Sequence, residues 1–98
     1  MAEIIWTEEA ERWLKDIYDY IAQDNPDEAM KVVEGKYERA QNLATFPQIG
    51  HKYREGAEGE IRLLLYSHYR IAYLISGPDR IDVLGVFHGA LKIDRYLE

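Results

Sequence analysis

Three polar side chains in the second half of the chain could transfer protons or bind anionic groups. His88 ends an apolar run beside Gly89, and an imidazole there could act as an acid or a base near neutral pH. Arg62 and Arg70 carry guanidinium groups, which bind phosphates or carboxylates through two parallel hydrogen bonds. If the protein is an enzyme that acts on phosphate groups, these three residues are its candidate catalytic groups.

Each of these residues also has a purely structural interpretation. His88 could be a solvated or hydrogen-bonded strand end. The two arginines could pair with acids on the same sheet, such as Glu60 and Asp82. Partner binding or sheet structure is thus an alternative to catalysis for Arg62 and Arg70.

Other kinds of site find little support in the sequence. The chain has no cysteine, which removes disulfides, thiolate zinc sites and cysteine nucleophiles. His51, His68 and His88 are far apart and lack a close ligand companion, so we expect neither a metal nor a cofactor. The stretch 51–54 interleaves basic and aromatic residues as phosphate-binding segments do, but a solvated loop is the simpler interpretation.

Length and charge narrow the class of protein further. The 98 residues allow one domain, 1–98, and 47% hydrophobic with 31% charged residues is an ordinary globular composition. The net charge of −6 falls entirely in residues 1–49, which opposes a general nucleic-acid-coating role. No apolar run approaches the length of a membrane span and no signal peptide is evident, so we expect a cytoplasmic protein without a membrane partner.

The elements that must position these residues begin with a strand and two helices. Residues 3–6 are rich in strand formers, and Thr7 is a suitable N-cap for a helix after them. Asn25 can cap a second helix that starts at Pro26 and ends at residues 46–47, which predicts an antiparallel helical hairpin. The aromatic residues of the hairpin are assigned to packing and given no function: Trp13, Tyr18, Tyr20 and Tyr37.

Strand signals dominate the second half. Three glycines and the lack of an apolar period mark residues 50–60 as an exposed loop. Strands are expected at 61–66, 69–75 and 80–88, and the short turns between them predict an antiparallel meander. Residues 89–98 would form one or two helical turns.

Alternation along these strands predicts two unlike faces. The odd-numbered residues are nearly all apolar and would receive the helices: Ile61, Leu63, Leu65, Tyr69, Ile71, Tyr73, Ile75, Ile81, Val83 and Phe87. The even-numbered face is too apolar to meet only water, because it includes Leu64, Leu74, Leu84 and Val86 beside Arg62 and Arg70. A partner is expected to cover it.

Six local phrases, in this order along nearly the whole chain, resemble the RelE/ParE superfamily of toxins from bacterial type II toxin–antitoxin systems. They are Trp6-Thr7 with Ala10-Glu11, Ile17-Tyr18-Asp19-Tyr20-Ile21-Ala22, Leu43 to Phe46-Pro47 with Gly50, Ile61-Arg62, Tyr69-Arg70-Ile71-Ala72-Tyr73, and Val86-Phe87-His88-Gly89-Ala90. The resemblance implies an α+β fold with an N-terminal strand, an antiparallel helical hairpin packed on one sheet face, and a three-stranded antiparallel meander.

The superfamily uses this fold for two mechanisms, and the resemblance is closer to the branch that inhibits DNA gyrase (ParE-like). That branch implies a protein that acts by binding, has no active site and is neutralised by a cognate antitoxin. The chain would form a homodimer or a hetero-oligomer with the antitoxin. The alternatives are a ribosome-dependent mRNA endoribonuclease (RelE-like), for which few lysines are present, and a non-toxic antitoxin-binding relic. Many relatives carry an arginine after Ala90, where this chain has Leu91. The antitoxin would bind Arg62, Leu64, Arg70, Leu74, Leu84 and Val86.

Overall fold

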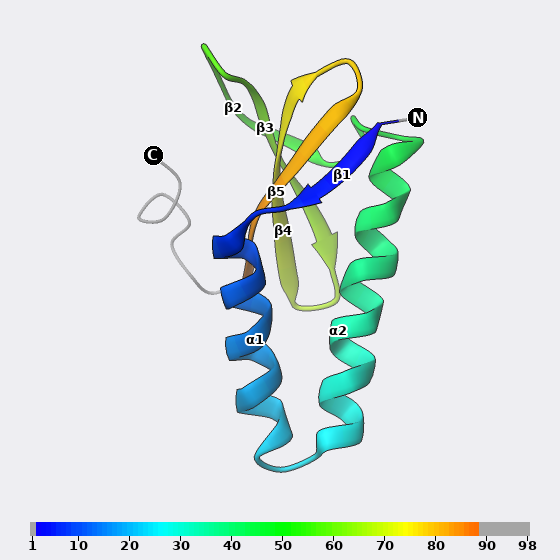
Figure 1. The fold of residues 1–98 in the computed structure, drawn as a ribbon, viewed down its shortest axis with the longest axis vertical. Helices are drawn as coiled ribbons and strands as arrows, with labels where there is room; N and C mark the ends of the chain where they lie inside the picture. The colour runs from blue at the N-terminus through cyan, green and yellow to red at the C-terminus, as the bar shows by residue number, and fades with distance from the viewer. Residues whose placement is uncertain (1, 89–98) are drawn as a thin grey trace.

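A computed structural model describes residues 2–88, and within them five strands form one sheet beside two long helices (Figure 1). The elements are β1 (Glu3–Trp6), α1 (Glu8–Ala22), α2 (Pro26–Gln41), a 3-10 turn (Asn42–Ala44), β2 (His51–Gly56), β3 (Gly59–Tyr66), β4 (Tyr69–Gly77) and β5 (Arg80–His88). The strand order is β1-β5-β4-β3-β2, and only the β1–β5 pair is parallel. The expected α+β fold is confirmed. The helical turns expected at 89–98 lie outside the described residues.

The helical hairpin begins and turns where the capping residues predict. The hydroxyl of Thr7 accepts a hydrogen bond from the amide of Ala10 at 3.1 Å and donates one to the carbonyl of Val83 at 2.8 Å. The side chain of Asn25 accepts a hydrogen bond from the amide of Glu28 at 3.1 Å. Both caps satisfy amides that a helix start leaves unpaired, and the first cap also ties α1 to β5.

One strand was not expected. Residues 51–56, predicted as part of a loop, form β2, which pairs antiparallel with β3 across the turn at 57–58. The strand lies at the sheet edge and most of its side chains are exposed, so it shows no apolar alternation. Gly59 follows the turn with φ of 136°, and a Cβ there would meet the carbonyl oxygen of Ile75 at 2.1 Å.

The assignment of all odd-numbered strand residues to the helix side is wrong. The two-residue turn at 67–68 pairs Tyr66 with Tyr69, which puts even residues of β3 beside odd residues of β4. In β5 the register shifts at Leu84, so residues 81 and 83 face the same way as residue 86. The helix side carries Leu64, Ile71, Tyr73, Ile81, Val83 and Val86, whereas the opposite side carries Ile61, Leu63, Ala72, Leu84 and Phe87.

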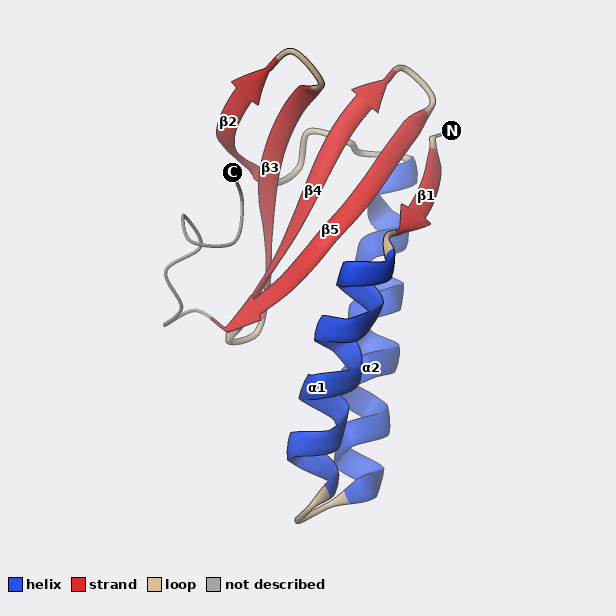
Figure 2. Ribbon diagram, turned by 60° about the vertical axis from the view of Figure 1, so that its left-hand side comes forward, coloured by secondary structure: helices blue, strands red, loops and turns tan. Residues whose placement is uncertain are grey.

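We call these two sides the inner face, which meets the helices, and the outer face. The inner face and the helices share one buried cluster that includes Ala10 and Leu14 of α1. The outer face has a smaller cluster around Ala72 and Phe87. Trp13 of α1 packs against both clusters, and its ring meets Phe87 edge-on with centroids 4.7 Å apart. Figure 2 shows that the helical hairpin extends beyond the end of the sheet.

A buried lysine lies where α2 meets the β3–β4 turn. Lys36 is fully buried, and its ammonium lies 3.7 Å from the ring centroid of Tyr69 and 5.1 Å from that of Tyr66. Its Nζ has no hydrogen-bond partner among residues 2–88. Burial therefore lowers the pKa of Lys36 to about 8, since the aromatic faces replace only part of its hydration.

The Lys36→Met substitution should stabilise the protein at pH 7, by roughly 2 kcal/mol once the lost cation–π contacts are subtracted. The gain should shrink as the pH rises above about 8. There the native wild type sheds this proton while its unfolded chain still holds it, so wild-type stability rises. Urea unfolding of both proteins from pH 7 to 10 measures this. Lys31→Met, at an exposed position of the same helix, is the control, and equal effects of the two substitutions would contradict the argument.

Candidate functional site

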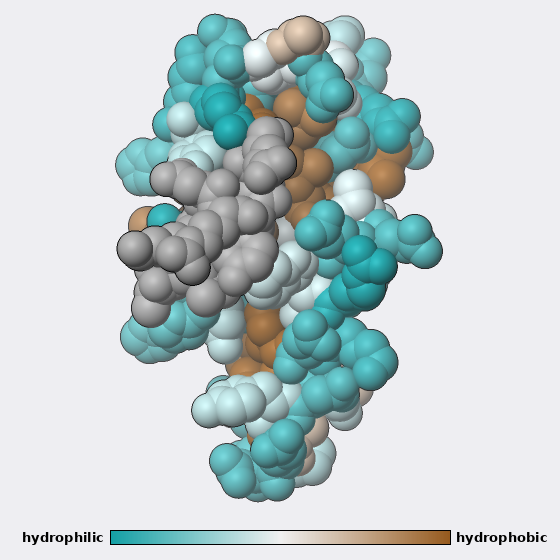
Figure 3. Space-filling model, turned by 90° about the vertical axis from the view of Figure 1, so that its left-hand side faces the viewer, coloured by the Kyte–Doolittle hydropathy of each residue, from teal (hydrophilic) through white to brown (hydrophobic). Residues whose placement is uncertain are grey.

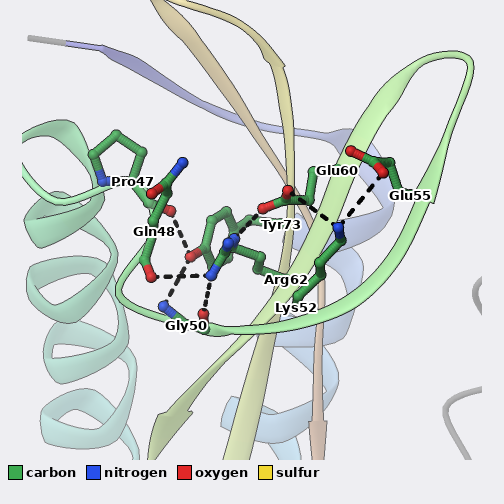
Figure 4. Close-up of polar contacts among 8 residues, drawn as sticks. All are labelled: Pro47, Gln48, Gly50, Lys52, Glu55, Glu60, Arg62 and Tyr73. Atoms are coloured by element: carbon green, nitrogen blue, oxygen red, sulfur yellow. Dashed lines mark hydrogen bonds and ion pairs between the residues drawn. The ribbon is translucent and has the colours of Figure 1, made fainter.

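Arg62, a candidate for both catalysis and partner binding, is engaged with its own chain. It projects from β3, and its Nη1 donates hydrogen bonds to the carbonyl oxygens of Gln48 at 3.0 Å and Gly50 at 2.6 Å (Figure 4). Its Nε pairs with the carboxylate of Glu60, and its side chain is only 16% exposed. The guanidinium thus fastens the 45–50 segment to the sheet.

Tyr73 fastens the same segment from the next strand. Its hydroxyl donates a hydrogen bond to the carbonyl of Pro47 at 2.7 Å and accepts one from the amide of Gly50 at 3.0 Å. Burial raises the pKa of Tyr73, so its hydroxyl keeps its proton. A Cβ at Gly50 would lie 2.7 Å from the carbonyl oxygen of Leu63, which leaves room only for glycine.

The tethered segment presents apolar side chains beside a hollow. Phe46 is 61% exposed and Ile49 46% exposed, and both line a hollow of about 760 Å³ together with residues of β4 and β5. On the other side of Arg62, Lys52 lies within ion-pair distance of Glu60. The function of the network is therefore to hold the segment that follows the helical hairpin.

The three candidate catalytic residues do not come together. Arg62 is paired with Tyr73 on the inner face, whereas Arg70 is paired with Phe87 on the outer face. His88 is exposed at the far end of β5, and its ring meets Tyr69 edge-on with centroids 5.7 Å apart. A base and a phosphate clamp built from these residues would need them within hydrogen-bond reach of one substrate.

The residues expected to bind an antitoxin also divide between the two faces. Leu64 is 2% exposed and Val86 is fully buried, and both belong to the core under the helices. The expectation of one shared even-numbered face is therefore wrong, for the reason of register given above. Arg70, Leu74 and Leu84 lie on the outer face, where Leu84 packs beside Ala72 and Phe87.

Sequence reasoning missed the residues that hold this region together. Tyr73 was assigned to the apolar core, and nothing nearby in the sequence shows that its hydroxyl reaches 26 residues back to Pro47. Lys36 was not singled out because it looks like one more helix charge. Tyr20, assigned to packing, is 76% exposed.

The part of the chain that the structure describes contains no group of three or more potential metal ligands. Within residues 2–88, neither helix is long and apolar enough to cross a membrane.

Removing either tether should loosen the fold. Tyr73→Phe leaves the carbonyl of Pro47 and the amide of Gly50 without their buried partner, which should lower the free energy of unfolding by about 1–3 kcal/mol. Arg62→Ala should have a similar effect because it frees Glu60 and two carbonyls. Arg80→Ala, which breaks only the exposed ion pair with Asp82, is the matched control and should leave stability nearly unchanged. Denaturant unfolding measures the free energy of unfolding of each variant. If Arg62→Ala were as stable as Arg80→Ala, Arg62 would not hold the 45–50 segment to the sheet.

Comparison with known proteins assigns the chain to a family. The family model described as "ParE toxin of type II toxin-antitoxin system, parDE" matches residues 4–92. A solved structure titled "Chromosomal ParDE TA system from P. aeruginosa" has the same fold, with a TM-score of 0.72, 24% sequence identity, and coverage of 90% of this chain and 96% of that chain. No curated protein matches the sequence. Because the family model spans nearly the whole chain, the protein belongs to the ParE toxin family of type II toxin–antitoxin systems.

Proposed function

We propose that the protein inhibits DNA gyrase in the cytoplasm by binding it, and that it uses no active site of its own. Membership of the ParE toxin family carries this proposal. The scatter of Arg62, Arg70 and His88 over two faces supports it over mRNA cleavage, because the fold offers these groups no common substrate position. The net charge of −6 also opposes approach to ribosomal RNA.

A cognate antitoxin neutralises the protein in this proposal. The outer face supports that role through Arg70, Leu74 and Leu84, which remain from the original set of six and do not belong to the helix-side core. Arg70 would pair with an acid of the antitoxin, and Leu84, which is only partly buried, would take one of its apolar side chains. Leu74 is 9% exposed and would support this contact from beneath. Leu84→Asp should then weaken antitoxin binding, and unchanged affinity would move the contact elsewhere.

The decisive assay adds the purified protein to bacterial DNA gyrase, relaxed plasmid and ATP. Supercoiling should stop and cleaved DNA should accumulate on the enzyme, because a bound inhibitor traps gyrase during strand passage. The same protein mixed beforehand with its antitoxin is the control and should leave supercoiling intact. Normal supercoiling at a large excess of the protein, although its induction arrests growth, would exclude gyrase as the target.

The two alternatives give different results in parallel experiments. Ribosomes programmed with a defined message should show no new cleavage at the A-site codon. A cleavage product that disappears with Arg70→Ala would instead support the endoribonuclease. Induction without antitoxin that leaves growth unaffected would support a non-toxic relic.

A further inference from the structure

A groove of about 460 Å³ runs between α1 and the ends of β4 and β5. Its walls are mostly aromatic or aliphatic: Trp13, Ile17, Tyr20, Tyr69 and Val86. Asp16 is its acidic residue, and His88 lines the strand end. Figure 3 views the side of the molecule on which α1 lies, where a narrow hydrophobic strip is flanked by hydrophilic surface.

The helical repeat places the groove residues of α1 on one side. Residues 13, 16, 17 and 20 occupy positions i, i+3, i+4 and i+7 of the helix, so they lie on one helix face. Trp13 and Ile17 of that face are partly buried and Asp16 is exposed, and the hairpin extends beyond the sheet at its far end. Tyr20 is 76% exposed there, more than a ring that serves only the core would be.

The charge of the groove complements a cation. Asp16 is exposed, and its carboxylate forms no hydrogen bond or ion pair with another residue between positions 2 and 88. The neighbouring base, Lys15, forms its ion pair with Asp19 at 2.9 Å, and Asp16 adds only a smaller contribution to the raised pKa of Lys15. Residues 1–49 together carry a net charge of −6, so the surrounding field also attracts positive charge.

We propose that this groove binds a lysine or arginine side chain of the antitoxin. The apolar stem of such a side chain would lie along Ile17 and Tyr69, which are only partly buried, and its charged head would reach Asp16 beside the ring of Tyr20. No other natural side chain combines a long apolar stem with a positive head. The inference rests on the proposed function for its partner, and it adds a contact from α1 that is separate from Arg70, Leu74 and Leu84.

The test measures the affinity of the protein for the product of the reading frame that adjoins its gene, by titration calorimetry. Asp16→Asn keeps the shape of the groove and removes its charge, so binding should weaken about tenfold. Asp24→Asn makes the same charge change beyond the end of α1 and should leave affinity unchanged. Raising the salt concentration should weaken wild-type binding more than Asp16→Asn binding, because only the wild type has the ion pair to screen.

A second variant and a partner scan keep the result interpretable. Tyr20→Ala should also weaken binding, and circular dichroism melting should show all three variants folded, since these side chains are exposed. Replacing the basic residues of the antitoxin one at a time with Gln should identify one whose loss adds nothing to Asp16→Asn.

Each other outcome overturns the proposal in a recognisable way. Unchanged affinity for Asp16→Asn with weaker binding by Tyr20→Ala would mean that an apolar side chain occupies the groove. A loss of self-association in Tyr20→Ala, with antitoxin affinity intact, would assign the groove to a second copy of the chain. If the wild type binds no antitoxin at all, the partner in the proposed function fails. If the wild type binds the antitoxin and neither Asp16→Asn nor Tyr20→Ala weakens binding, the groove is not the contact, and the proposed function is unaffected.

Discussion

Burial of one face of the sheet under the helical hairpin is the constraint on which the rest of the structure depends. A chain of 98 residues has enough apolar side chains for one large cluster, and this cluster joins α1 and α2 to β3, β4 and β5. The hydroxyl of Thr7 couples the start of α1 directly to β5. The inner face is committed to the core, and Ala72 and Phe87 of the outer face are buried as well. Exposed apolar side chains remain at Leu65 of the outer face and at Tyr20 near the projecting end of the hairpin.

Several residues whose chemistry suggests function serve the fold instead. Arg62 has the guanidinium that phosphate binding would need, but it is occupied by Glu60 and by two backbone carbonyls. Tyr73 and Lys36 are polar side chains buried within the structure, and they differ in how well the surrounding groups satisfy their hydrogen-bonding atoms. The hydroxyl of Tyr73 both donates and accepts, whereas the ammonium of Lys36 relies on two aromatic rings. Residue type alone therefore cannot separate a site from a structural tether.

The sequence predicts local structure well where one residue determines a boundary. Thr7, Asn25 and Pro26 placed both helix starts, because capping is an interaction between neighbours in sequence. The sequence pattern does not predict the charged edge strand β2, because an edge strand gains its stability from backbone pairing and needs no apolar alternation.

Which face of each strand is buried could not be predicted by counting along the chain. After the turn at 67–68 the odd-numbered residues of β4 lie on the same face as the even-numbered residues of β3. The extra residue at Leu84 changes once more which residue numbers face the helices. The same error in register affects the predicted antitoxin-binding residues, because they combine core residues such as Leu64 with outer-face residues such as Leu84. Long-range contacts were also beyond local patterns, and the hydrogen bond from Tyr73 to Pro47 is one of them.

The assignment of the two faces is tested most directly by the adjacent residues Leu64 and Leu65. Leu64 is 2% exposed under the helices, whereas Leu65 is 56% exposed on the strand's other side. Substituting each with Ala and measuring denaturant unfolding should give a loss of about 2–5 kcal/mol for Leu64→Ala. Leu65→Ala should change stability by less than about 1 kcal/mol, as surface substitutions usually do. Equal losses, or a larger loss for Leu65→Ala, would contradict the register of β3 and the assignment of its buried face.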